Sequence, residues 1–167
     1  YTSIEGKRLA ILNFAENEWS TTKGDYPGAV GFDTVSNFQS IQEAKKNFDF
    51  VLVITHGGHE NYNLPSKSFR DLLRFFVDAG ADAIVNHHPH CITGFEIYNG
   101  KPIYYSIGNF LFDKRGSDFT YWNKGLAAEI NFSDHIINAK THIFYQSVIY
   151  NLDKVFFYNH NLHLVQN

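Results

Sequence analysis

The clearest periodicity in the chain is that of an amphipathic helix in its middle part. Apolar residues recur there at spacings of three and four positions, as on the buried face of a helix: Phe69, Leu72, Leu73, Phe76 and Val77. Ser66 stands where this helix would begin, and Gly80 stands where a left-handed C-terminal cap is expected. Short apolar runs at 49–55 and 81–85 flank it and are typical of buried parallel strands. Residues 49–86 therefore predict a strand, a helix and a strand joined by one right-handed crossover.

Two more elements are predicted before this unit. Residues 8–14 form a short apolar run that indicates a buried strand, and residues 36–46 have the period of a helix. The apolar face of that helix carries Phe38, Ile41 and Ala44. Between them, residues 15–35 are rich in Gly, Thr, Asn and Asp and predict a long surface loop. Loops of this length are often functional.

The second half of the chain changes to a pattern typical of antiparallel strands. Asn99-Gly100 is a strong turn signal between 95–98 and 101–107, so these residues predict a β-hairpin. A second pair of strands is predicted at 126–132 and 136–144, joined around Ser133 and Asp134. The tail, residues 147–167, has no clear period and its structure is left undecided. The predicted fold class is α/β, with a parallel βαβ unit followed by antiparallel strands.

Composition narrows the class of protein. A chain of 167 residues with 44% hydrophobic and 17% aromatic residues is expected to form one domain, 1–167, with a real core. The net charge is −3 and no basic stripe occurs, which argues against nucleic acid as a partner. One cysteine, Cys91, excludes an internal disulfide and a cysteine-only zinc site. No apolar run reaches the length of a membrane span.

Histidines follow two of the predicted strands at the point where each strand ends. The strand at 49–55 leads into HGGHE, residues 56–60, and the strand at 81–85 leads into NHHPH, residues 86–90. Since ligand sites in parallel sheets form at the carboxyl ends of strands, both groups are expected at the same edge of the sheet. Clustered histidines point to metal binding, proton transfer or a packed polar network.

Local geometry divides the histidines of the second group. Pro89 favours an extended conformation at His88, and residues two apart in an extended chain share a face. His88 and His90 are therefore predicted to point at one spot while His87 points away. With His56 they are the candidate metal ligands, and the competing explanation is a surface or structural network. His87 is as consistent with packing or hydrogen bonding behind the metal ligands as with being a ligand itself.

The remaining chemistry-bearing residues are weaker candidates. His59 and Glu60 are candidates for catalytic roles or are solvated loop residues, and the sequence does not separate the two. Cys91 could bind a soft metal, but an inert buried thiol is the favoured interpretation. Four scattered histidines receive no function: His135, His142, His160 and His163.

Three ordered motifs, VITHGGHENYNLPS, FVDAGADAIVNHHPH and GKPIYYSIGNFLFD, resemble those of the bacterial capsule-synthesis protein CapA family, associated with poly-γ-glutamate biosynthesis. The resemblance is continuous over residues 48–113. That family is similar in fold to calcineurin-like metallophosphoesterases, which are αββα sandwiches with a two-metal centre. The resemblance thus implies that this chain is the C-terminal part of such a sandwich.

The resemblance also implies roles for single residues. His56 resembles the lone histidine ligand that follows a strand in metallophosphoesterases. His88 and His90 resemble the ligand pair of their Gly-His-x-His motif, and His87 stands where the glycine is usual. Asn109, in SIGNF, matches a family motif and is expected near the site, with a turn asparagine as the competing explanation.

The chain departs from the metallophosphoesterase pattern upstream of His56. Asp-x-His and Gly-Asn motifs are not found there, and the Gly-Asp pair Gly24-Asp25 lies in a predicted loop rather than after a strand. The chain begins at Tyr1 and contains no methionine. We therefore expect a C-terminal portion whose metal site takes its carboxylates from the upstream part of the same protein.

Two functions remain open from the sequence. The first is a metal-dependent hydrolase or transferase of capsule or poly-γ-glutamate biosynthesis, with one or two divalent ions (Zn, Mn or Fe) and a phosphorylated or polyglutamate-type substrate. In it His59 or Glu60 would orient ligands or act as general acid. The second is a non-catalytic scaffold or polymer-binding component with the same fold. The resemblance implies a bacterial protein, either cytoplasmic or at the cell surface with an anchor outside this chain.

Overall fold

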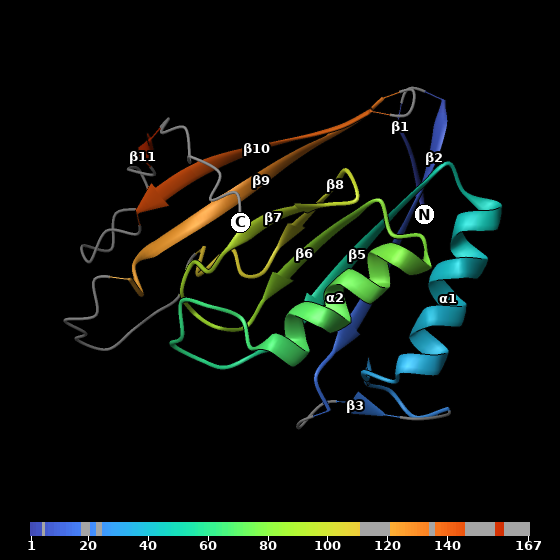
Figure 1. Ribbon diagram of the computed structural model, residues 1–167, viewed down its shortest axis with the longest axis horizontal. Coiled ribbons are helices and arrows are strands. Elements are labelled where there is room, and N and C mark those ends of the chain that lie inside the picture. Colours follow the sequence, from blue (N-terminus) through green and yellow to red (C-terminus); the bar gives the residue numbers. More distant parts are fainter. Residues whose placement is uncertain are drawn as a thin grey trace.

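The structure is a computed structural model that describes residues 1–4, 6–17, 21–22, 25–110, 121–133, 136–145 and 156–158. A mixed six-stranded sheet forms its centre, in the order β1-β2-β5-β6-β8-β7 (Figure 1). The elements are β1 (Thr2–Ile4), β2 (Lys7–Ala15), β3 (Thr21–Thr22), β4 (Ala29–Val30), α1 (Thr34–Asn47), β5 (Phe50–His56), α2 (Lys67–Ala79), β6 (Ala83–His87), β7 (Phe95–Tyr98), β8 (Lys101–Tyr104), β9 (Lys124–Ser133), β10 (Ile136–Tyr145) and β11 (Phe156–Tyr158).

The middle of this sheet is parallel. β5 pairs with β2 on one side and β6 on the other, and β6 pairs in parallel with β8. Val51 and Val53 of β5 are completely buried, as expected for a run of β-branched residues in a central strand. The predicted strand–helix–strand unit is therefore confirmed. Figure 1 shows β5 and β6 ending at the same edge of the sheet.

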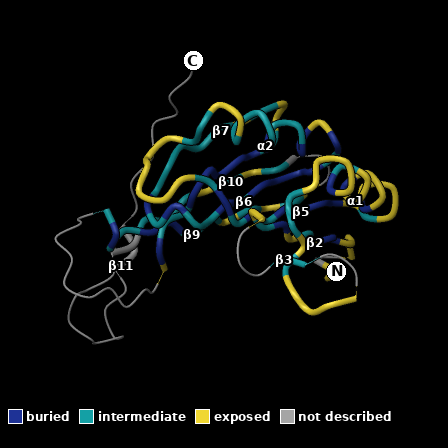
Figure 2. The backbone as a smooth tube through the Cα atoms, turned by 90° about the horizontal axis from the view of Figure 1, so that it is seen from below, coloured by how far each residue is buried: buried dark blue, intermediate teal, exposed yellow. Residues whose placement is uncertain are grey.

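Both predicted helices are confirmed, and both pack on one face of the sheet. Ser66 caps α2 by accepting a hydrogen bond from the Phe69 amide, and Gly80 ends it with a φ of 125°. Asp33 caps α1 in the same way through the Ser36 amide. Figure 2 shows that α1 keeps an exposed outer side, which follows from its single buried stripe around Ile41.

The opposite face of the sheet is covered in part by the long hairpin of β9 and β10. The rings of Phe50 and Phe132 lie 5.0 Å apart, and the Tyr104 hydroxyl donates to the Lys140 carbonyl oxygen at 3.3 Å. In the described residues the layers are thus helices, the large sheet and a smaller sheet of β9, β10 and β11. The α/β class and both predicted hairpins are confirmed.

Some boundaries differ from the predicted ones. β6 runs two residues further, through Asn86 and His87, because both polar residues keep pairing with the neighbouring strand β5. The predicted loop at 15–35 contains the two-residue strands β3 and β4. Of the tail, only 156–158 is described. Several positions discussed above lie outside the described residues: Gly24, Asp134, His135, His160 and His163.

Candidate histidine site

The histidine groups meet at the carboxyl edge of the parallel sheet. His56 ends β5 and His87 ends β6, and the two are register partners. On the other side of β5, Ala15 at the end of β2 is the register partner of His56. The predicted convergence on neighbouring strands is therefore confirmed. It follows from parallel pairing, which aligns the ends of adjacent strands.

Three imidazoles form a hydrogen-bonded chain at this edge. The Nδ1 atoms of His56 and His87 lie 2.9 Å apart, and Nε2 of His56 lies 3.1 Å from Nδ1 of His88. The ring centroids of these two pairs are 4.5 Å and 4.7 Å apart. In each pair one nitrogen donates and the other accepts. Both nitrogens of His56 thus contact other imidazoles, which orients its ring.

His90 is held by a different set of neighbours. Its Nδ1 donates to the side-chain oxygen of Asn109 at 2.8 Å, and the Asn109 amide nitrogen donates to the Trp122 carbonyl oxygen at 3.0 Å. The indole of Trp122 stacks on the His90 ring with a centroid distance of 4.7 Å and an interplanar angle of 21°. Because Nδ1 carries the proton, the lone pair of His90 lies on Nε2.

A carboxylate completes a group with metal-ligand chemistry. One ligand atom each from Glu60, His88 and His90 lies within 4.8 Å of the others. His56 contacts His88 but is outside this group. The structure therefore brings together His88 and His90 from the predicted ligand set, and adds Glu60, which the sequence indicates as a candidate for a catalytic role. His59 is exposed, and its ring lies 6.1 Å from that of Tyr62.

The backbone geometry predicted around Pro89 is wrong. His88 has a φ of 109° and His90 a φ of 57°, so neither is extended. The chain bends sharply after β6 instead, and the Pro89 carbonyl oxygen accepts a hydrogen bond from the Asn61 amide at 2.8 Å. The bend still leaves the rings of His88 and His90 with centroids 6.0 Å apart. The two histidines do converge, but through left-handed backbone rather than alternation.

His87 is outside the group of Glu60, His88 and His90, and its ring contacts that of His56. It is half-buried, and this burial lowers the pKa of His87, with further lowering by the neighbouring histidines His56, His88 and His90. The neutral imidazole is thus favoured at this position. Cys91 is buried, its Sγ lies 3.1 Å from the Tyr62 carbonyl oxygen, and burial raises the pKa of its thiol. Those features fit the interpretation of Cys91 as an unreactive thiol.

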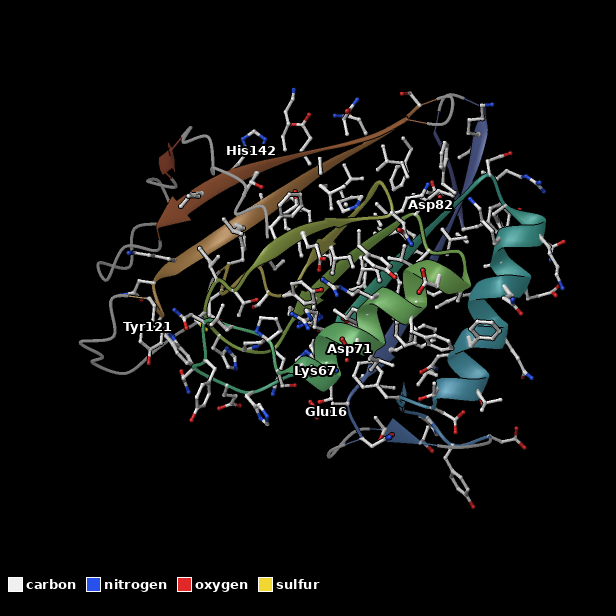
Figure 3. The ribbon with its side chains drawn as sticks, viewed as in Figure 1. Glu16, Lys67, Asp71, Asp82, Tyr121 and His142 are labelled. Carbon is white, nitrogen blue, oxygen red and sulfur yellow. The ribbon has the colours of Figure 1, made fainter. Side chains whose placement is uncertain are left out.

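Two residues at this edge were not identified from the sequence. Glu16 directly follows β2, and its carboxylate accepts a hydrogen bond from the Gly58 amide at 2.9 Å. Its position after a strand was the available signal. Trp122 lies 32 positions after His90, and no sequence pattern connects the two. In Figure 3 Glu16 lies near the N-terminal end of α2, whereas His142, on β10, lies at the opposite side of the view.

The fold and the site define an α/β protein with a histidine cluster at the carboxyl edge of a parallel sheet. Comparison with known proteins places it further: the chain belongs to the family described as bacterial capsule synthesis protein PGA_cap, whose family model matches residues 1–114. The PGA biosynthesis protein CapA of Bacillus subtilis (strain 168) is 41% identical over 116 residues. The capsule biosynthesis protein CapA of Bacillus anthracis is 38% identical over 120 residues.

These relatives are much longer than the chain. The matches cover 68% of this chain in both cases, but only 30% of the Bacillus subtilis protein and 29% of the Bacillus anthracis protein. Within the described residues, neither helix has the length and apolar character needed to cross a membrane.

Proposed function

We propose that this chain supplies the histidine-rich part of a divalent-metal centre in a protein of capsule or poly-γ-glutamate synthesis that acts as a hydrolase or transferase. The observation that carries the proposal is the convergence of Glu60, His88 and His90, whose ligand atoms lie within 4.8 Å of one another. The family membership and the names of the two relatives support a role in capsule or poly-γ-glutamate synthesis. The substrate would be a phosphorylated or polyglutamate-type molecule.

The donor set fits Zn²⁺, Mn²⁺ or Fe²⁺. Two imidazoles and a carboxylate are common ligands of these ions, and imidazole makes Ca²⁺ a poor fit. Zn–N bonds of about 2.0–2.1 Å place two ligands of one ion no more than about 4.2 Å apart. Small side-chain rotations would therefore bring atoms that now lie within 4.8 Å onto a single ion. Such an ion would polarise a phosphoryl or acyl oxygen and activate a water molecule.

The chain's own residues prepare this site in two ways. Asn109 holds the His90 proton on Nδ1, which directs Nε2 toward ligand binding, as outer partners of metal-binding histidines do. His56 contacts Nδ1 of His88 and orients that ring in the same manner. In this arrangement His87 supports His56, and the ligand role predicted for His56 requires its ring to leave one of these contacts.

We further propose that carboxylates from the upstream part of the same protein complete the centre, as the metallophosphoesterase resemblance implies. The two sheets of this chain would then form part of an αββα sandwich. Glu16 already lies at the same edge, hydrogen-bonded to the loop that follows His56.

Calorimetric titration of the whole protein, with its upstream part included, with Zn²⁺ and with Mn²⁺ tests the metal site. We expect binding by the wild type, and affinity reduced by about tenfold to a hundredfold or more in His88→Ala, His90→Ala and Glu60→Gln. His142→Ala is the matched control, because His142 also lies beside a carboxylate, 2.9 Å from Glu129, but on β10. Absence of binding by the wild type, or equal losses in the control, would contradict the proposal.

A non-catalytic scaffold or polymer-binding role is the second candidate, and one observation favours it. The imidazoles of His56, His87 and His88 hydrogen-bond to one another, so the cluster is a connected polar network by itself. A structural cluster predicts that His56→Ala lowers the free energy of unfolding by about 1–3 kcal/mol without changing Zn²⁺ or polymer binding. Loss of Zn²⁺ binding in the ligand variants would exclude it.

A further inference from the structure

Asn86 is a completely buried polar residue in the strand that leads into the histidines. Its side-chain oxygen accepts a hydrogen bond from the Thr55 hydroxyl at 2.7 Å. Its amide nitrogen donates to the carbonyl oxygens of Gly57 at 2.9 Å and Tyr105 at 2.7 Å. All three side-chain bonds are thus made to residues of other segments, and none to its own strand.

Two of these partners are the sequence neighbours of His56. Thr55 immediately precedes His56 and Gly57 immediately follows it, so the Asn86 side chain bonds to the residues on both sides of His56. The Gly57 amide in turn donates to the His87 carbonyl oxygen at 3.1 Å. The segment around His56 is therefore tied to the end of β6 by bonds that do not involve any imidazole.

The bond to the Tyr105 carbonyl oxygen connects Asn86 to the segment that leads to Asn109 and His90. Besides the bond to Tyr105, the Asn86 carbonyl oxygen accepts from the Ile107 amide at 3.1 Å. The chain then turns at Gly108 and reaches Asn109, which holds Nδ1 of His90. Asn86 thus links β5, β6 and the extension of β8, the segments that carry the orienting contacts of His56, His87 and His90.

An apolar residue could fill this buried position without the desolvation that an amide requires. A fully satisfied buried network instead favours one arrangement of the groups that it joins. We propose that Asn86 is a positioning residue: its side chain sets the spacing and orientation of the histidine-bearing segments at the carboxyl edge. Its consequence for metal binding rests on the proposed function, whereas its consequence for imidazole geometry does not.

The test uses variants that remove all or one of the side-chain bonds of this network. Asn86→Ala removes all three side-chain bonds, and Thr55→Val removes one hydroxyl with little change of shape. Thr55→Ser retains the hydroxyl and should restore the wild-type behaviour. Asn37→Ala is the matched control, because Asn37, in α1, is also buried, 1% exposed, and its side-chain oxygen accepts a hydrogen bond from the Asp33 amide.

The first measurement is nuclear magnetic resonance of the metal-free protein. The imidazole N–H shared by His56 and His87 should give a slowly exchanging resonance in the wild type, Thr55→Ser and Asn37→Ala. We expect it to be lost or shifted in Asn86→Ala and Thr55→Val. If Asn86→Ala does not fold, Thr55→Val decides, because it changes one buried atom group.

The second measurement is Zn²⁺ affinity by calorimetry. We expect about a tenfold to a hundredfold weaker binding in Asn86→Ala and Thr55→Val, as for other outer partners of ligands, and unchanged binding in the Asn37→Ala control. An unchanged imidazole resonance and unchanged affinity in both site variants would overturn the positioning role. Should the wild type bind no Zn²⁺, the proposed function fails, and the resonance comparison still decides the role of Asn86.

Discussion

Two buried polar residues stand at opposite ends of β6 and act on different parts of the molecule. Asn86 lies at the carboxyl end beside the histidines. Asp82 precedes the amino end, is 2% exposed, and accepts hydrogen bonds from Lys45 at 2.6 Å and Lys101 at 2.8 Å. Figure 3 places Asp82 far from Glu16, which marks the carboxyl edge. Stability and site geometry can therefore be perturbed separately.

Asp82→Ala is expected to destabilise the fold without affecting the site. The substitution deprives the buried Val51 amide of its acceptor, 2.9 Å away, and leaves two ammonium groups without their shared carboxylate. Both lysines are partly exposed, so we expect a loss of about 2–3 kcal/mol in the free energy of unfolding, below that of a fully buried pair.

Urea unfolding measures that loss. The control is Asp71→Ala, which removes a solvent-exposed carboxylate paired with Lys67 one helical turn away, and it should change stability little. Zn²⁺ affinity should be the same in both variants as in the wild type. A weakened Zn²⁺ affinity in Asp82→Ala would show that the two ends of β6 are coupled.

At the scale of elements, α2 is attached to the hairpin of β7 and β8 by an ionic network. Arg74 of α2 donates to the carboxylate of Glu96, which also accepts a hydrogen bond from the Tyr105 hydroxyl at 2.7 Å. Burial raises the pKa of Glu96, but the bonds from Arg74 and Tyr105 lower it more, and the net shift is downward. The Arg74 guanidinium also lies over the Tyr98 ring, 5.2 Å from its centroid.

This network predicts an acid-sensitive contribution to stability. A carboxyl whose pKa is lower in the folded state stabilises the fold above its unfolded pKa of about 4.3, and the contribution is lost as pH falls through the lowered value. Urea unfolding between about pH 6 and pH 3 should therefore show a steeper loss for wild type than for Glu96→Gln. One proton limits the difference in slope to about 1.4 kcal/mol per pH unit. Parallel pH profiles would contradict this role of Glu96.

Substitutions at two glycines with nearly the same φ distinguish the cost of left-handed backbone strain from the cost of a steric clash. Gly100, in the hairpin turn, has a φ of 73° and open space where a Cβ would be. Gly108 has a φ of 69°, and its Cβ would lie 2.6 Å from the Lys124 carbonyl oxygen. Gly100→Ala should cost about 1–2 kcal/mol through left-handed strain alone.

Gly108→Ala should cost clearly more than Gly100→Ala, because the start of β9 must also move. The same movement would displace Asn109, so the imidazole resonances of His90 should change in Gly108→Ala only. Urea unfolding and nuclear magnetic resonance of the two variants measure these effects. Equal losses of stability would show that the backbone at Gly108 adapts without displacing β9.

At the scale of the whole molecule, a metal bound at the carboxyl edge would join segments that are distant in sequence. A ligand that binds only the folded state raises the free energy of unfolding by about 2.7 kcal/mol at a concentration a hundred times its Kd. We expect Zn²⁺ to raise the thermal midpoint of the wild type and a chelator to reverse the change. The His88→Ala variant should show no such increase, while His142→Ala should respond as the wild type does.

Much of the fold was predictable because its signals are local. The spacing of Phe69, Leu73 and Phe76 predicts α2, and Asn99-Gly100 predicts the turn between β7 and β8. The parallel unit then requires the ends of β5 and β6 to meet at one edge. The sequence by itself therefore determined the main elements, the α/β class and the edge at which the histidines gather.

The tertiary structure decided which side chains meet within that edge. The preference for an extended residue before Pro89 predicts an extended His88, but His88 and His90 both adopt left-handed backbone. The bend after β6 and the hydrogen bond from the Asn61 amide to the Pro89 carbonyl oxygen override that local preference. The contacts of His87 with His56, of Glu60 with the two histidines, and of Trp122 with His90 join residues from separate segments. Such contacts depend on the paths of whole loops, and a local pattern contains no information about where a distant loop returns.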